Sequence, residues 1–412
     1  MIRKLLLVFV LSLLLPACKS QLQSPGTPPA NFRVTAGDSQ AVLTWTMEPG
    51  QTYSVYYQVG PQVSPANYVG FASPAVSPFT VTGLVDQTQY AFIVDASNQG
   101  SVPGPPTPIV TVTPGGTGAG QAWTVGGGLT AQTLHSVAYG NEFYVAVGDA
   151  GAVYVVNVST ASSSGIGTWN PPNGLLPTGL EALAAVVFTG SGFTALADQG
   201  DVISSTNTET WTSGQKATVT GSPQMTALAS GAGTLVAVGF NSTILTNSSL
   251  TASAPWVTRN AHLPQQEQLY GISYVNGKFI AVGQSGTLLT SDDGGATWVV
   301  ENSTVTVNLY KAAYGAGGYV VVGDAGTILW SPDAVNWVQE TAPTSEDLYG
   351  VAYGVDAEFV VVGINGVLLS SPLGTDGTWT VTGAGGTTLN DVVAGNTVFV
   401  AVGDVGANIS GK

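Results

Sequence analysis

Short runs of hydrophobic residues alternate with polar turns throughout residues 121–412, and the runs recur with a period of about 42 residues. The clearest copies read LYGISYVNGKFIAVGQSGTLLTSDDGGATW (Leu269 to Trp298), LYKAAYGAGGYVVVGDAGTILWSPDAVNW (Leu309 to Trp337) and LYGVAYGVDAEFVVVGINGVLLSSPLGTDGTW (Leu348 to Trp379). Such a period, with several short apolar strands in each unit, predicts a β-propeller.

The repeats predict seven blades of four strands each, in an all-β chain. The last copy ends after its third strand, near Ile409, while an unmatched tryptophan, Trp123, precedes the first copy. We expect the strand around Trp123 to complete the last blade and close the ring, because that sheet edge is then paired. The innermost strands are expected to begin at Leu134, Leu183, Met225, Leu269, Leu309, Leu348 and Leu389.

Residues 29–113 form a separate pattern of alternating strands bounded by Gly, Pro, Asn and Asp, which predicts a β-sandwich. Trp45, Leu84 and Tyr90 stand where a core tryptophan and a tyrosine corner belong, so this segment resembles a fibronectin type III domain. The resemblance implies a spacer, with ligand binding as the alternative. The Gly-rich residues 114–120 are expected to be a linker before the propeller at 121–412.

The chain begins with an export signal at residues 1–17: two basic residues, a leucine-rich stretch and Pro16-Ala17. Leu15 to Cys18 resembles the box of bacterial lipoproteins, which implies that Cys18 is lipidated; an ordinary signal with an incidental cysteine is the alternative. Residues 18–28 would be a tether. Lys19 after the cysteine favours the outer membrane, so we expect an exported protein held at the cell envelope by its lipid alone.

The net charge of the chain limits the classes of partner that it is expected to bind. The net charge is −15, and only 8% of the residues are charged. This balance argues against nucleic acid and against anionic membrane surfaces, which attract Lys and Arg. Cys18 is the only cysteine, so no disulfide is expected. His135 and His262 lack ligand-spaced partners, and no metal site is predicted.

Ser291 to Trp298 matches the pattern Ser-x-Asp-x-Gly-x-Thr-Trp, and Ser331 to Trp337 matches it in part. The propeller is therefore similar to Asp-box propellers: bacterial neuraminidases, xyloglucanases and the photosystem II assembly factor. We expect Asp293 and Asp333 to bond turn amides and not to be catalytic. This sequence lacks a functional feature that each of these families implies. Neuraminidases imply three arginines where this propeller has Arg259 alone, xyloglucanases imply two propellers, and the assembly factor implies a basic partner surface.

Two columns of residues are predicted to meet on one face of the ring. The turns after the second strands carry acidic residues, and the second position of three consecutive innermost strands carries tyrosine. The carboxylates could hold a hard cation such as Ca²⁺ or hydrolyse glycosides, or could simply shape Asp-x-Gly turns. The tyrosines suit sugar stacking or a protein hot spot, or could pack between blades. The candidate binding residues are Asp149, Asp198, Asp324, Asp404, Tyr270, Tyr310 and Tyr349.

These observations lead to one main hypothesis and two alternatives. The main hypothesis is a lipid-anchored binding or scaffold protein whose propeller face engages a protein or a neutral glycan at the envelope. It assigns no catalytic residue and no cofactor, and it leaves Ca²⁺ open. The alternatives are a glycoside hydrolase or lyase acting on a neutral polysaccharide, and an assembly factor for an envelope complex.

Overall fold

The computed structural model describes the chain in two compact units, Met1–Gly116 and Thr117–Lys412. The export segment, Cys18 and residues 114–120 lie outside the described residues. None of the helices in the described part has the length and apolar character needed to cross a membrane. The described residues are 26–37, 40–85, 88–98, 102–113, 123–126, 129–158, 166–219, 221, 224–263, 266–354, 357–383 and 386–411.

The first unit contains two antiparallel sheets. Trp45, Tyr53 and Phe92 are buried in its core. The Tyr90 hydroxyl accepts a hydrogen bond from the backbone N–H of Val85 at 3.0 Å, as a tyrosine corner requires. One sheet has the order β1 (Arg33–Gly37), β2 (Gln40–Thr44), β5 (Phe79–Thr82), and the other has the order β4 (Gly70–Ala75), β3 (Gln51–Val59), β6 (Tyr90–Asn98), β7 (Val110–Val112).

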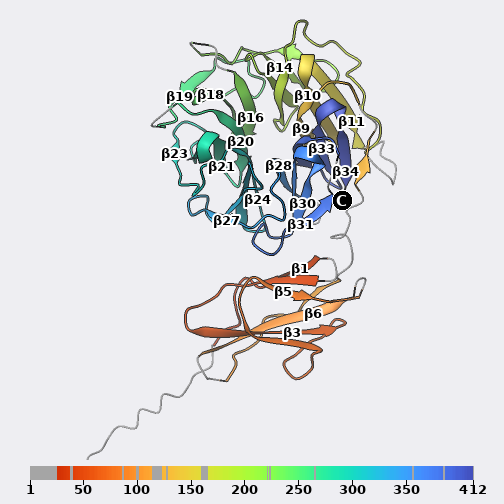
Figure 1. The fold of residues 1–412 in the computed structure, drawn as a ribbon, viewed down its shortest axis with the longest axis vertical. Coiled ribbons are helices and arrows are strands. Elements are labelled where there is room, and N and C mark those ends of the chain that lie inside the picture. Colours follow the sequence, from red (N-terminus) through yellow and green to blue (C-terminus); the bar gives the residue numbers. More distant parts are fainter. Residues whose placement is uncertain are drawn as a thin grey trace, which may run out of the picture. The chain divides into compact units, whose positions relative to one another are not determined.

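The second unit contains seven antiparallel sheets, numbered 1 to 7 here in chain order, and Figure 1 shows them arranged around a centre. All seven innermost strands begin at the residues that the repeat predicts, so this prediction is confirmed. Each repeat begins with a fully apolar residue that is buried, and this residue fixes the start of the strand. The innermost strands are β9 (Leu134–Gly140), β12 (Leu183–Phe188), β16 (Met225–Gly231), β20 (Leu269–Val275), β24 (Leu309–Gly315), β28 (Leu348–Gly354) and β32 (Leu389–Ala394).

The remaining strands of each sheet follow outward in chain order. The second strands are β10 (Phe143–Gly148), β13 (Phe193–Ala197), β17 (Thr234–Gly239), β21 (Lys278–Gly283), β25 (Gly318–Gly323), β29 (Glu358–Gly363) and β33 (Phe399–Gly403). The third strands are β11 (Ala152–Asn157), β14 (Val202–Ser205), β18 (Thr243–Asn247), β22 (Leu288–Ser291), β26 (Ile328–Ser331), β30 (Leu368–Ser371) and β34 (Asn408–Gly411). The outer strands of sheets 2 to 6 are β15 (Thr212–Ser213), β19 (Val257–Arg259), β23 (Val299–Val300), β27 (Val338–Glu340) and β31 (Thr380–Gly383).

The two ends of the repeat array differ from the other sheets. In sheet 1 a single bridge between Val155 and Asn170 replaces a fourth strand among the described residues. In sheet 7 the fourth strand is β8 (Thr124–Val125), which pairs with β34 through Val125 opposite Ile409. Each innermost strand contacts the next one along the chain, and β32 contacts β9.

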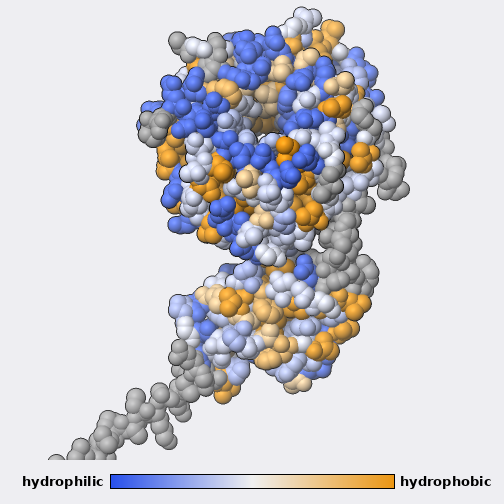
Figure 2. Space-filling model, viewed as in Figure 1, coloured by the Kyte–Doolittle hydropathy of each residue, from blue (hydrophilic) through white to orange (hydrophobic). Residues whose placement is uncertain are grey.

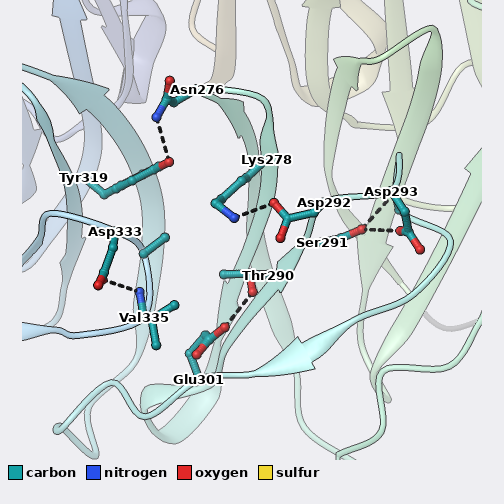
Figure 3. Close-up of polar contacts among 12 residues, drawn as sticks. Asn276, Lys278, Thr290, Ser291, Asp292, Asp293, Glu301, Tyr319, Asp333 and Val335 are labelled. Carbon is teal, nitrogen blue, oxygen red and sulfur yellow. Dashed lines mark hydrogen bonds and ion pairs between the residues drawn. The ribbon is translucent and has the colours of Figure 1, made fainter.

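The Asp boxes have the structural role expected of them. Asp293 accepts a hydrogen bond from the Ser291 hydroxyl (Figure 3). It also accepts hydrogen bonds from the Thr297 hydroxyl and from the Ala296 and Thr297 amides. Chiefly through Thr297, these donors hold the pKa of Asp293 at about 2. Trp298 is buried behind the turn and donates its indole N–H to the Gly295 carbonyl at 3.0 Å. The carboxylate therefore orders a turn that seals the space between sheets.

Candidate functional site

Every innermost strand carries a β-bulge at its second residue. In sheet 5, Leu309 lies opposite Gly323 and Lys311 opposite Val322, which leaves Tyr310 between them without a partner residue. The same shift occurs in the other six sheets. A bulge bends its strand and changes the direction of the extra side chain. The seven bulge residues, called the mouth ring below, are His135, Ala184, Thr226, Tyr270, Tyr310, Tyr349 and Asn390.

The mouth ring lies at one end of a central cavity of about 720 Å³ that all seven innermost strands line. Figure 2 shows hydrophilic residues over much of the surface of this unit. Each ring residue is half-buried, whereas the leucine or methionine before it is buried. The bulge thus turns the second side chain of each strand toward the cavity, while its neighbour anchors the sheet. The sequence predicted the column of residues but not the bulges that aim them.

The three predicted tyrosines lie together at this mouth. The ring centroids of Tyr270 and Tyr310 are 5.5 Å apart, and those of Tyr310 and Tyr349 are 5.2 Å apart in an edge-to-face arrangement. Phe240, from the turn after β17, extends the row with its centroid 6.3 Å from that of Tyr270. Ring pairs at these separations attract one another by about 0.5–1.5 kcal/mol beyond the burial of area. Sheets 3 to 6 therefore present a continuous aromatic arc.

Three of the four predicted carboxylates contact the mouth ring. Asp324 Oδ1 accepts the Tyr310 hydroxyl at 2.6 Å, and Asp404 Oδ1 accepts the Asn390 side-chain amide at 3.1 Å. The third contact joins Asp149 Oδ1 and His135 Nε2 at 2.8 Å. In each pair the ring residue and the carboxylate belong to the same sheet and stand 14 residues apart in the chain.

The turns that carry these carboxylates are tight, as the alternative interpretation expects. The glycines two residues after the carboxylates have positive φ, for example +70° at Gly326. However, Asp149, Asp324 and Asp404 bond to ring residues, and among the described residues they accept no bond from their own turn amides. The turn interpretation is therefore right about the glycines and wrong about these three aspartates. His135 contacts Asp149, but this single pair belongs to no group of three or more metal-binding side chains in the described part of the chain.

Asp198 is the exception among the four carboxylates. The ring residue of its sheet is Ala184, which has no hydrogen-bond donor to offer. Asp198 Oδ1 is buried and has no hydrogen-bond partner among the described residues. Sheet 2 therefore keeps the acceptor of the repeating pair but lacks its donor.

Burial and nearby negative charge both raise the pKa of the tyrosines at the mouth. Burial raises the pKa of Tyr310, and the hydrogen bond to Asp324 raises it further. Burial also raises the pKa of Tyr349, followed in effect by the negative charges of Asp347, Asp324 and Asp404. The phenols are therefore neutral at physiological pH, and Tyr349 lies in the field of several carboxylates.

One residue further along the strands, an ion pair crosses the cavity. Lys311 Nζ bonds to Asp391 Oδ1 and, at 3.1 Å, to the Val392 carbonyl, so β24 is joined to β32. Asp391 Oδ2 also accepts the Ser136 hydroxyl at 3.1 Å and the Val137 amide at 3.0 Å. Sequence reasoning missed this cluster. A lysine and an aspartate at the same position of two otherwise apolar strands were the signal that could have revealed it.

The four candidate carboxylates, Asp149, Asp198, Asp324 and Asp404, do not form a metal-binding group in the part of the chain that the structure describes. Within the ranges that the structure describes, no group of three or more His, Cys, Asp or Glu side chains is placed to hold an ion. Asp149, Asp324 and Asp404 instead contact ring residues of their own sheets. Chemically, the mouth offers aromatic faces and negative charge around an open cavity.

Comparisons with known proteins bear on the fold. No protein-family model and no curated protein matches the chain. Among solved structures, "YCF48 bound to D1 peptide" matches with a TM-score of 0.55 and 17% identity, covering 70% of this chain and 94% of the other. "YCF48 from Cyanidioschyzon merolae" matches with a TM-score of 0.54 and 15% identity, covering 70% of this chain and 98% of the other. These likenesses show that the chain has a β-propeller-like fold.

Proposed function

We propose that this chain is an exported, lipid-anchored binding protein whose mouth ring engages a protein partner. One observation carries the proposal: a bulge in each of the seven sheets directs a side chain to the mouth of one cavity, and three of these side chains are tyrosines in contact. Bulges are enriched at functional sites because they re-aim side chains. Rigid, partly exposed tyrosines are typical anchors of protein interfaces.

We also propose a specific architecture for each of the two units. The second unit would be a seven-bladed propeller closed by β8, supported by the pairing of Val125 with Ile409 and by contact of the Trp123 ring with Gly411. The first unit would be a fibronectin type III-like spacer, supported by its sheets of three and four strands and by the hydrogen bond of Tyr90. The spacer would hold the mouth away from the membrane.

The anchor rests on the sequence alone. We propose that Cys18 carries the lipid and that the chain resides in the outer membrane. Metabolic labelling with an alkyne fatty acid tests this directly: the wild type should be labelled and a Cys18→Ser variant should not. Labelling that persists in the variant would contradict the anchor, and fractionation of the two membranes would test the location.

A protein partner is favoured over a glycan. YCF48, whose fold this chain resembles at 17% identity, has a structure bound to a D1 peptide, which supports a peptide or protein as the kind of partner. An assembly factor for an envelope complex is a narrower form of the same proposal. The geometry does not support the glycoside hydrolase alternative. Each of three candidate carboxylates is bonded to a ring residue: Asp149, Asp324 and Asp404.

Site-specific photocrosslinking tests the proposed function. A benzophenone amino acid replaces Tyr349 at the mouth or, as the control, Val381 on the outer strand β31 of the same sheet, which is 49% exposed. We expect an envelope protein to be crosslinked from position 349 and not from position 381. Equal crosslinking from both positions would contradict a role for the mouth. Binding to a neutral glycan array with no crosslinked protein would replace the protein partner by a glycan.

A further inference from the structure

The mouth has two chemically different sides. Sheets 3 to 6 supply the aromatic arc, which runs from Phe240 to Tyr349. Sheets 7 and 1 supply Asp404 and Asp149, each in contact with its ring residue. Asp324 lies within the aromatic side, because it belongs to sheet 5 and accepts the hydroxyl of Tyr310 at 2.6 Å. An occupant of the mouth would therefore meet aromatic rings and one carboxylate on one side, and two further carboxylates on the other.

Asp149, Asp324 and Asp404 have no lysine or arginine partner within the part of the chain that the structure describes. Among the described residues that line the cavity, Lys311 is the only lysine or arginine, and Asp391 pairs with it. The net charge of the whole chain is −15. The carboxylates Asp347, Asp324 and Asp404 lie close enough to Tyr349 for their charge to raise the pKa of its phenol, after the effect of burial. The mouth is thus a region of negative potential bordered by aromatic rings.

We propose that the mouth binds a lysine or arginine side chain on an exposed segment of the partner protein; this inference rests on the proposed function. The cation lies over the electron-rich faces of the tyrosines and pairs with the carboxylates. Its aliphatic stem packs on the aromatic arc while its charged head reaches the acidic side. A neutral sugar would stack on the rings but leave the carboxylates unused, and an anionic segment would be repelled.

The tyrosines are already positioned for this role. The Tyr310 hydroxyl donates to Asp324, and the Tyr270 hydroxyl donates to Gln268 Oε1 at 3.0 Å. Neither ring therefore has to be ordered when the cation arrives, and less entropy is lost on binding.

The test uses the full mature chain, with Cys18→Ser for solubility, and four fluorescent peptides. The peptides are identical except for a central Arg, Lys, Gln or Glu. We expect the Arg and Lys peptides to bind at least about 10-fold more tightly than the Gln peptide, as a cation–π contact combined with an ion pair predicts. The Glu peptide should bind most weakly. Raising NaCl from 20 to about 300 mM should weaken the cationic peptides several-fold, because salt screens exposed charge.

Variants identify the groups responsible. Tyr349→Leu removes a ring and should weaken the Arg peptide by about 5-fold to 20-fold, whereas Tyr349→Phe should retain binding. The double variant Asp324→Asn with Asp404→Asn removes two charges and keeps acceptor oxygens, so it should also reduce the preference for Arg over Gln. Asp292→Asn is the matched control, because this carboxylate is 69% exposed and belongs to the Asp-box turn of sheet 4. Thermal unfolding of each variant confirms that it folds.

Two results would overturn the proposal. One is equal affinity for the Gln and Arg peptides; the other is a loss of Arg binding with Asp292→Asn as large as with the double variant. The crosslinking experiment separates this failure from that of the proposed function. Suppose that the double variant still captures the same partner from position 349 with undiminished yield. Recognition of a cationic side chain is then refuted, whereas binding of a protein at the mouth is still supported. If nothing is captured from position 349, the proposed function itself fails.

Discussion

The ion pair between Lys311 and Asp391 makes the energetics of the ring testable. Its side chains are 27% and 10% exposed, respectively, so both charges are largely removed from water. Asp391 also accepts the Ser136 hydroxyl and the Val137 amide from sheet 1. The pair and its hydrogen bonds thus join sheets 5, 7 and 1 across the cavity. Replacing either partner should destabilise the seven-sheet unit.

The loss of folding free energy in each variant depends on which charged or polar groups the replacement leaves unpaired. Lys311→Met leaves a buried carboxylate without its cation, which costs about 3–5 kcal/mol in a buried site and about 2–3 kcal/mol here, since the lysine is partly exposed. Asp391→Ala removes the acceptor of two sheet 1 donors and leaves the lysine unpaired, for a loss of about 3 kcal/mol. The double variant has no unpaired charge. Its loss should fall short of the sum of the single losses by about 2 kcal/mol.

Urea unfolding of the four proteins measures this double-mutant cycle. Tryptophan fluorescence is a suitable probe, because the chain has nine tryptophans and Trp45 is the one within the sandwich segment at 29–113. The control cycle uses Lys278 and Asp292, whose side chains are 26% and 69% exposed and which pair at the surface (Figure 3). That cycle should show a coupling below about 1 kcal/mol. Unchanged m-values would show that the folded and unfolded ensembles are comparable.

Additive losses at Lys311 and Asp391, within about 0.5 kcal/mol, would refute this reasoning, because groups that interact directly must couple. Equal coupling in the buried and surface cycles would also refute it. Such a result would mean that burial adds nothing to the pair.

Three further predictions follow from single positions. Ala184→Asn should give Asp198 the donor that it lacks and stabilise the unit by about 1 kcal/mol, measured as a higher Tm; a lower Tm would contradict this. Burial, followed by the charge of Asp376, raises the pKa of Glu340 to about 7, above its ordinary value of 4.5. The folded state therefore holds the extra proton, so stability should fall by about 1 kcal/mol, after allowance for screening, as pH rises from about 5 to 8. Unfolding at several pH values should show this slope in the wild type, and Glu340→Gln should lack it. Gly271→Ala would place a Cβ 1.8 Å from the backbone carbonyl oxygen of Tyr310, on the neighbouring innermost strand. We expect the free energy of unfolding to fall by more than about 2 kcal/mol and the mouth to bind more weakly. Urea unfolding and peptide titration measure these two effects.

Periodicity alone predicted the strand starts of the ring, because each start is a buried apolar residue that repeats with the unit. It also predicted that the strand near Trp123 belongs with the last sheet, where Val125 lies opposite Ile409. These features depend on residue type and spacing, which a sequence displays directly.

The bulges and the ion pair could not be predicted in the same way. A bulge changes the register by one residue without a required residue type, since His135, Ala184 and Tyr310 all occupy it. The contact of Lys311 with Asp391 spans 80 residues and depends on how sheets 5 and 7 face one another. A charged residue in an apolar strand marks such a position, but the identity of its partner emerges only from the arrangement of the sheets.

The bulge links binding to stability in this ring. By adding one residue at the start of each innermost strand, it places position two at the mouth and the next position in register with the second strand. Tyr310 and Lys311 are neighbours in the chain, yet the first contacts Asp324 of its own sheet and the second contacts Asp391 of sheet 7. The aromatic arc is therefore attached, through one peptide unit, to the ion pair that holds sheet 5 to sheet 7. Loss of that pair should loosen Tyr310 as well as the ring, so the residues that stabilise the cavity also hold the mouth in the geometry that a partner would meet.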